Sequence, residues 1–150
     1  MGVACVMLKN RAVSSLLLGV LFFLSSCSGA TKNLGAGLWG ALGGGHGVSQ
    51  LVNGFASNLS KDAAASKALG AEGIEGAKNG LYNSIAKTGG FGIEKGSDLN
   101  SVLKGMKLDA GAVNGIGQSL DATVREQGLH AEQATAVSAL WNEISKGLAK

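Results

Sequence analysis

Proline is absent from this 150-residue chain, and aromatic side chains are scarce. Only 5% of the residues are Phe, Trp or Tyr, whereas 45% are hydrophobic and 25 residues are glycine. The apolar volume therefore comes mostly from Leu, Ile, Val and Ala, which favours closely packed helices over an aromatic-rich β-sandwich. A chain of this length has room for one domain with a real hydrophobic core.

Clustered positive charge is also missing. Because Lys9 and Arg11 precede Cys27, the chain from Cys27 onward holds 11 of the 13 basic residues and all 10 acidic residues. Proteins that bind nucleic acid need a concentrated basic surface. The near balance of charge therefore predicts no nucleic-acid partner.

Residues that usually carry catalysis or hold cofactors are few. His46 and His130 are the only histidines, and no cysteine lies near either, so a zinc site would need two carboxylates from elsewhere in the chain. No Gly-Lys dipeptide occurs, which excludes a P-loop. Glu72 and Glu75 stand three residues apart, a spacing that usually marks a solvated helix face. We therefore expect no catalytic residues, no cofactor and no metal site.

The N-terminus is divided into three regions. Residues 1–11, MGVACVMLKNR, carry positive charge, and the apolar stretch AVSSLLLGVLFFL follows them. The small residues of SSC then lead to Cys27. This order is typical of a secretory signal peptide, and the apolar stretch is shorter than the roughly 20 residues that span a bilayer. An uncleaved anchor is the alternative, and both Met1 and Met7 remain open as the start.

The segment Leu24-Ser25-Ser26-Cys27 resembles the lipobox of bacterial lipoproteins, in which an aliphatic residue and two small residues precede a cysteine. The resemblance covers the first 27 residues and implies removal of residues 1–26 as a signal peptide. It also implies a diacylglycerol on the Cys27 thiol and an acyl chain such as palmitate on the new amino group. Membrane lipid is then the first partner, since more than one buried acyl chain gives stable attachment.

Two further expectations follow from this resemblance. The residue after Cys27 is Ser28 and not Asp. By resemblance to lipoproteins of Gram-negative bacteria, this implies transport to the outer membrane, with the protein facing the periplasm. Cys5 lies in the segment that would be removed, and Cys27 would be bound to lipid. The mature chain would therefore have neither a free thiol nor a disulfide, and its stability would come from packing alone.

Residues 33–60 carry no formal charge, and the segment GLWGALGGGHG within them is dense in glycine. Each glycine inside a helix costs about 1 kcal/mol relative to alanine, so we expect residues 27–47 to form a lipidated, Gly-rich tether. Alternatively, Ala36, Gly40 and Gly44 repeat at every fourth position, a spacing that lets helices pack closely in lipid. Gly40 and Gly44 would then be the helix-contact glycines of a membrane-active protein.

From residue 48 onward, apolar residues recur at helical spacing, which predicts an all-α domain of four to five short helices over residues 48–150. Ser97 and Asp109 are expected to cap two of these helices, and Gly128 is expected to end one. His130 is expected at the cap or first turn of the last helix. The predicted apolar faces are Val48, Leu51, Val52, Phe55 and Leu59; Ile74, Leu81, Tyr82 and Ile85; Leu99, Val102, Leu103 and Met106; Val113, Ile116, Leu120 and Val124; and Ala134, Val137, Leu140, Trp141, Ile144 and Leu148.

Three segments share an Asn-Gly pair followed by apolar residues: VNGFASNL at 52–59, KNGLYNSI at 78–85 and VNGIGQSL at 113–120. Asn-Gly often marks a hairpin turn, but apolar residues four positions apart fit a helix better. Each glycine is then a flat spot where two helices approach closely. Duplication and chance similarity both remain open as the origin of these segments.

These observations favour a cell-envelope lipoprotein with a non-enzymatic binding or structural role at the membrane surface, and an envelope protein is a candidate partner. The first alternative is a membrane-active, bacteriocin-like or pore-forming protein that uses the glycine zipper of Gly40 and Gly44. The second alternative is an envelope enzyme.

Overall fold

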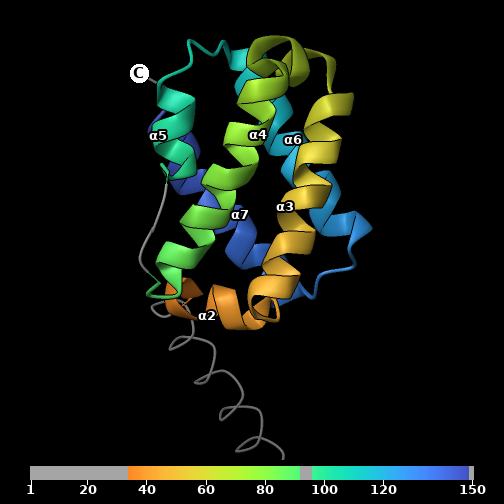
Figure 1. Cartoon of the computed structure of the whole chain (residues 1–150). Helices are drawn as coiled ribbons and strands as arrows, with labels where there is room; N and C mark the ends of the chain where they lie inside the picture. The colour runs from red at the N-terminus through yellow and green to blue at the C-terminus, as the bar shows by residue number, and fades with distance from the viewer. Residues whose placement is uncertain (1–33, 92–95, 149–150) are drawn as a thin grey trace, which may run out of the picture. The chain divides into compact units, whose positions relative to one another are not determined.

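The structure is a computed structural model that describes residues 34–91 and 96–148, with side chains from residue 37 onward (Figure 1). The chain from Gly35 to Lys150 forms one compact unit. The predicted signal peptide, the lipobox and Cys27 lie outside the described residues.

The described residues form six helices and no strand, which confirms the predicted all-α class. No helix in these ranges combines the length and the hydropathy needed to cross a bilayer. The helices are α2 (Leu34–Ala41), α3 (Gly44–Lys61), α4 (Ala63–Thr88), α5 (Leu99–Lys104), α6 (Ala110–Glu126) and α7 (Ala131–Lys146).

Helices α3 and α4 lie side by side, and α6 packs against both of them (Figure 1). Helix α5 packs against α4, while α7 packs against α5 and α6. Helix α4 bends at Gly70, whose φ of 65° lies in the left-handed region that favours glycine. The short α2 lies at the end of the unit where α3 begins and α4 ends.

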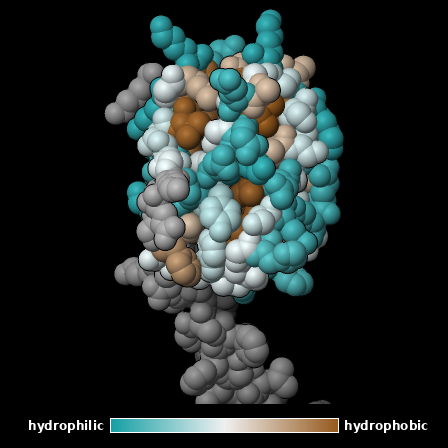
Figure 2. All heavy atoms as spheres, viewed as in Figure 1, coloured by the Kyte–Doolittle hydropathy of each residue, from teal (hydrophilic) through white to brown (hydrophobic). Residues whose placement is uncertain are grey.

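The predicted apolar faces supply most of the core. The whole predicted face of α3 is buried, and so are Leu81 and Ile85 of α4 and Leu99 and Leu103 of α5. In α7, Val137 and Ile144 are buried, whereas Leu140 and Trp141 are half-buried. The face seen in Figure 2 is largely hydrophilic, with separate hydrophobic patches between the polar side chains.

Aspartate side chains cap three of the helices. The Oδ1 atom of Asp109 accepts a hydrogen bond from the Ala112 backbone N–H at 2.7 Å, as the predicted cap should. The predicted Ser97 cap is wrong by one residue, because Asp98 Oδ1 accepts from the Ser101 backbone N–H at 2.9 Å. Asp62 caps α4 through the Ala65 N–H at 2.7 Å. At the other end of α6, Gly128 has a φ of 60° and ends the helix as expected.

Residues 34–47 form α2, a two-residue turn and the start of α3, where the sequence predicted a tether. Leu38 is 2% exposed and Leu42 is 7% exposed, so both belong to the core. The Trp39 ring packs edge-on against Tyr82 and at a tilt against Phe91, with ring centroids 5.7 Å and 4.8 Å apart. Burial of these side chains offsets the helix cost of the glycines. The compact unit therefore begins at Gly35 instead of the predicted residue 48.

The glycines of the Asn-Gly pairs do lie where helices approach closely. A Cβ on Gly54 would come within 2.8 Å of the Thr123 side chain, and one on Gly80 would come within 2.9 Å of the Leu99 Cα. A Cβ on Gly115 would lie 2.4 Å from Asp62 Oδ1. All three distances are too short for a side chain, which confirms the predicted flat spots.

Candidate functional site

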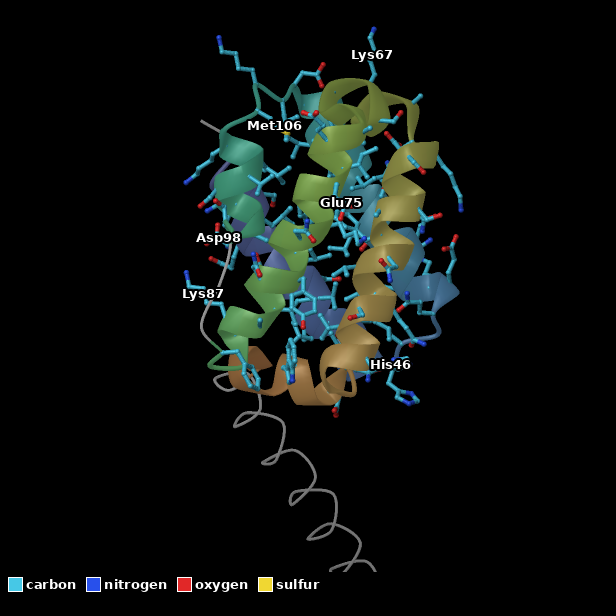
Figure 3. All side chains as sticks on the ribbon, in the orientation of Figure 1. His46, Lys67, Glu75, Lys87, Asp98 and Met106 are labelled. Carbon is cyan, nitrogen blue, oxygen red and sulfur yellow. The ribbon has the colours of Figure 1, made fainter. Side chains whose placement is uncertain are left out.

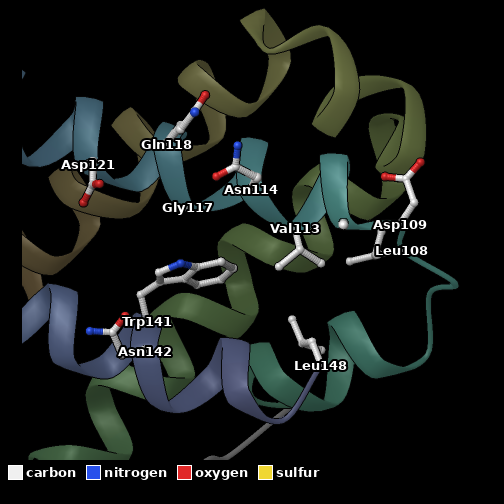
Figure 4. Close-up of a pocket in the computed structure, with 11 residues that line it drawn as sticks. Leu108, Asp109, Val113, Asn114, Gly117, Gln118, Asp121, Trp141, Asn142 and Leu148 are labelled. Atoms are coloured by element: carbon white, nitrogen blue, oxygen red, sulfur yellow. The ribbon is translucent and has the colours of Figure 1, made fainter. Parts of the chain in front are cut away.

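A groove with a volume of about 590 Å³ lies between α6, α7 and the loop that precedes α6 (Figure 4). Sites for small molecules are typically concave, with apolar walls and a few convergent polar groups. The groove has this character. It is lined by Leu108, Asp109, Ala110, Val113, Asn114, Gly117, Gln118, Asp121, Trp141, Asn142 and Leu148.

Helix α6 supplies two adjacent rows of lining residues. Val113 and Gly117 are four positions apart and form a row on one side of the helix. Asn114, Gln118 and Asp121 form the next row, and all three are exposed. The Asp109 cap fixes where α6 begins, so the groove lining starts at the first turn of this helix.

Gly117 allows Trp141 to pack directly against α6. A Cβ at this position would lie 2.6 Å from the Trp141 Nε1 atom and 3.1 Å from its Cε2 atom. Any other residue type would force the indole ring or α6 to shift. Trp141, which the sequence placed in the core, is half-buried and forms part of the groove wall (Figure 4).

The polar side chains of the α6 row are available to a ligand. Within the described residues, the side chains of Asn114, Gln118 and Asp121 make no hydrogen bond, and neither does the indole N–H of Trp141. Asp109 differs, since its carboxylate caps α6. The groove therefore presents hydrogen-bonding groups that the fold does not use.

Nothing in the described part of the chain brings three or more metal-ligating side chains together. His46 is exposed and points away from the helices, with its Nε2 atom 3.3 Å from Gln50 Nε2 (Figure 3). His130 is the N-cap residue of α7, and its backbone N–H donates to Gln133 Oε1 at 2.8 Å. The two histidines thus occupy an open surface and a helix terminus.

Glu72 and Glu75 lie on the solvent-exposed side of α4, as the spacing predicted. Glu75 Oε1 is 3.4 Å from Lys78 Nζ, and both side chains are partly or largely exposed. Ion pairs of this kind contribute little to stability. Nothing in their surroundings directs the two carboxylates toward a common substrate position.

Gly40 and Gly44 do not share a helix in this structure. Leu42 and Gly43 separate α2 from α3, and Gly43 and Gly44 have φ values of 84° and 70°. A Cβ on Gly40 would meet nothing within 4 Å, and one on Gly44 would be 3.7 Å from the Trp39 Nε1 atom. The described residues therefore place no close helix contact at either glycine.

A smaller hollow of about 330 Å³ lies between α4, α5 and α7. Its charged groups already have partners, since Lys87 Nζ is 3.6 Å from Asp98 Oδ2 (Figure 3). Glu143 likewise pairs with Lys146. The buried Asn100 Oδ1 atom has no hydrogen-bond partner in the described residues. The α6–α7 groove, with its row of unused polar side chains, is the better candidate site.

In the sequence, Asn114 belongs to one of the Asn-Gly segments, and Trp141 belongs to the apolar face of the last helix. Neither pattern indicated that the two residues meet in one groove, because 26 positions and a turn separate them.

The chain matches no family model, no curated protein and no solved structure.

Proposed function

We propose that this chain is a non-enzymatic binding protein of the bacterial cell envelope, anchored by lipid at Cys27. The observation that carries the proposal is the segment Leu24–Cys27, which ends an apolar stretch of signal-peptide length. By resemblance to lipoproteins of Gram-negative bacteria, Ser28 favours the outer membrane with the protein facing the periplasm. The helical unit is then the part that acts at the membrane surface.

The geometry of the α6–α7 groove supports a binding role. Its described lining offers amides, carboxylates and an indole, but no histidine, cysteine, serine or lysine. Acid–base catalysis by carboxylates needs a group beside a positioned partner, whereas Asp109 and Asp121 are twelve positions apart and Asp109 caps α6. Amides and an aromatic ring are suited instead to holding a ligand through hydrogen bonds and apolar contact.

Metabolic labelling with a clickable palmitate tests the lipid anchor. We compare the wild-type chain with Cys27→Ser and use Cys5→Ser as the matched control, since Cys5 lies in the segment predicted to be removed. We expect equal labelling of the wild type and Cys5→Ser, and no labelling of Cys27→Ser. Label that persists in Cys27→Ser would contradict the proposal.

A further inference from the structure

The α6–α7 groove has an apolar floor and a polar rim (Figure 4). Val113, Trp141 and Leu148 form the floor. The rim on α6 consists of Asn114, Gln118 and Asp121, at positions i, i+4 and i+7, so it extends about 10 Å along the helix axis. A matching ligand presents an apolar face to the floor and several hydrogen-bonding groups along one edge.

The charges at the groove disfavour an anionic ligand. Asp109 and Asp121 are the charged residues in its described lining, and no lysine or arginine joins them. Lys104 and Lys107 line a neighbouring hollow that shares Leu108, Val113 and Leu148 with the groove. A phosphate or nucleotide on the rim of Asn114, Gln118 and Asp121 would meet a carboxylate, with no cation in the groove lining itself.

A metal ion or a compact cation also fits poorly. Asp109 and Asp121 are separated by about 18 Å along α6, since each residue adds about 1.5 Å to a helix. The Asp109 carboxylate is also occupied by the Ala112 backbone N–H. The two negative charges thus do not converge on one point of the groove.

We propose that the α6–α7 groove binds a neutral saccharide, with a ring face against Trp141 and hydroxyl groups against Asn114 and Gln118. The face of a pyranose ring carries polarised C–H groups, which the negative face of an indole attracts. Its hydroxyls both donate and accept hydrogen bonds, as side-chain amides do. The inference rests on the binding role proposed above and names the class of ligand.

The two tryptophans provide a direct test. We titrate the isotope-labelled full chain, in micelles of a detergent without a sugar headgroup, with cellobiose and with N,N′-diacetylchitobiose. The chain has two indole N–H signals, which Trp141→Phe assigns. We expect at least one of the two sugars to move the Trp141 signal saturably. The Trp39 signal should stay in place, because Trp39 packs against Tyr82 and Phe91 away from the groove.

Asn114→Ala is the test variant, and Asn53→Ala is its matched control. Both asparagines are exposed and begin an Asn-Gly pair, but only Asn114 lines the groove. Loss of one ligand hydrogen bond should raise the Kd for the sugar about fivefold or more in Asn114→Ala. Asn53→Ala should keep the wild-type Kd, and the remaining signals of both spectra show that the fold is retained.

Three results would overturn the saccharide assignment. The first is no movement of the Trp141 signal with either sugar up to about 50 mM, a range that reaches even weak binding. The second is an equal effect of Asn114→Ala and Asn53→Ala. The third is a saturable response to spermidine but not to the sugars, which would indicate a cationic ligand. None of them alters the labelling of Cys27, so this inference fails independently of the lipid anchor.

Discussion

At the scale of single residues, the glycines of this chain differ in which neighbouring atoms a side chain at each position would contact. Gly80 lies against the backbone of Leu99, Gly43 adopts a left-handed φ of 84°, and Gly40 faces open space. Sequence spacing predicted close contact at the Asn-Gly glycines and, in the alternative hypothesis, at Gly40 and Gly44. Only the Asn-Gly glycines lie at such contacts, because contact depends on which helix face a neighbour covers.

Gly80→Ala and Gly76→Ala test this difference on one helix. A Cβ at Gly80 would be 2.9 Å from the Leu99 Cα, so α5 must move, and we expect a loss of about 1–3 kcal/mol in the free energy of unfolding. A Cβ at Gly76 would be 3.5 Å from Val102, an ordinary contact, and we expect a gain of up to about 1 kcal/mol from helix propensity. Urea unfolding followed by circular dichroism measures both. Equal effects would contradict the close approach of α4 and α5.

The lowered pKa of Asp98 makes the free energy of unfolding depend on pH under acidic conditions. A hydrogen bond from the Ser101 backbone N–H, followed by one from the Ser101 hydroxyl, lowers the pKa of Asp98 from its ordinary value of 3.8; burial opposes the shift and Lys87 adds to it. A carboxyl with a lowered pKa in the folded state stabilises the fold above its unfolded pKa. This contribution is lost as the pH falls below 3.8 and through the lower pKa that Asp98 has in the folded protein.

Asp98→Asn tests the assignment, since asparagine caps a helix about as well as aspartate but does not titrate. The wild type should lose stability relative to Asp98→Asn as the pH falls below 3.8. Urea unfolding of both proteins between about pH 6 and about pH 2 measures the difference. A difference that stays constant with pH would show that the Asp98 carboxylate contributes nothing in its charged form.

At the scale of elements, apolar periodicity predicted that α3 to α7 exist because each buries apolar residues at helical spacing, but it missed the first part of α4, which bends at Gly70. The ends marked by Ser97, Asp109 and Gly128 were predicted to within about one residue, because they use ordinary capping chemistry. The start of α4 at Ala63 was not predicted. Helix α2 was not predicted. Its glycines lower local helix propensity, whereas burial of Leu38 and the contacts of Trp39 with Tyr82 and Phe91, far along the chain, stabilise it. Such packing is invisible in local composition.

Leu38→Ala and Gly40→Ala separate a packed helix from a tether. Leu38 is 2% exposed, and its truncation should cost about 2–5 kcal/mol in the free energy of unfolding. Gly40→Ala adds a methyl group that meets nothing within 4 Å, so it should be neutral or stabilise the fold by up to about 1 kcal/mol. Denaturant unfolding of the two variants checks both values. A tether would leave the stability unchanged in both.

At the scale of the whole molecule, polar contacts join helices that lie far apart in the sequence. The buried Asn58 of α3 donates to Thr123 Oγ1 at 3.0 Å and to Glu126 Oε2 at 2.9 Å, both on α6. Gln127 Nε2 likewise donates to the Gln50 carbonyl at 2.7 Å. The α6–α7 groove has the same long-range origin. Trp141 reaches it only because Gly117 leaves space, so no local pattern predicts the site.

We propose that a lipid on Cys27 holds the helical unit at a membrane. The most direct measurement is the intact mass of the protein purified from the membranes of a Gram-negative host. We predict a chain that begins at Cys27 and carries a diacylglycerol together with an amide-linked acyl chain. An unmodified full-length chain, or a chain cut at another residue without lipid, would contradict the account.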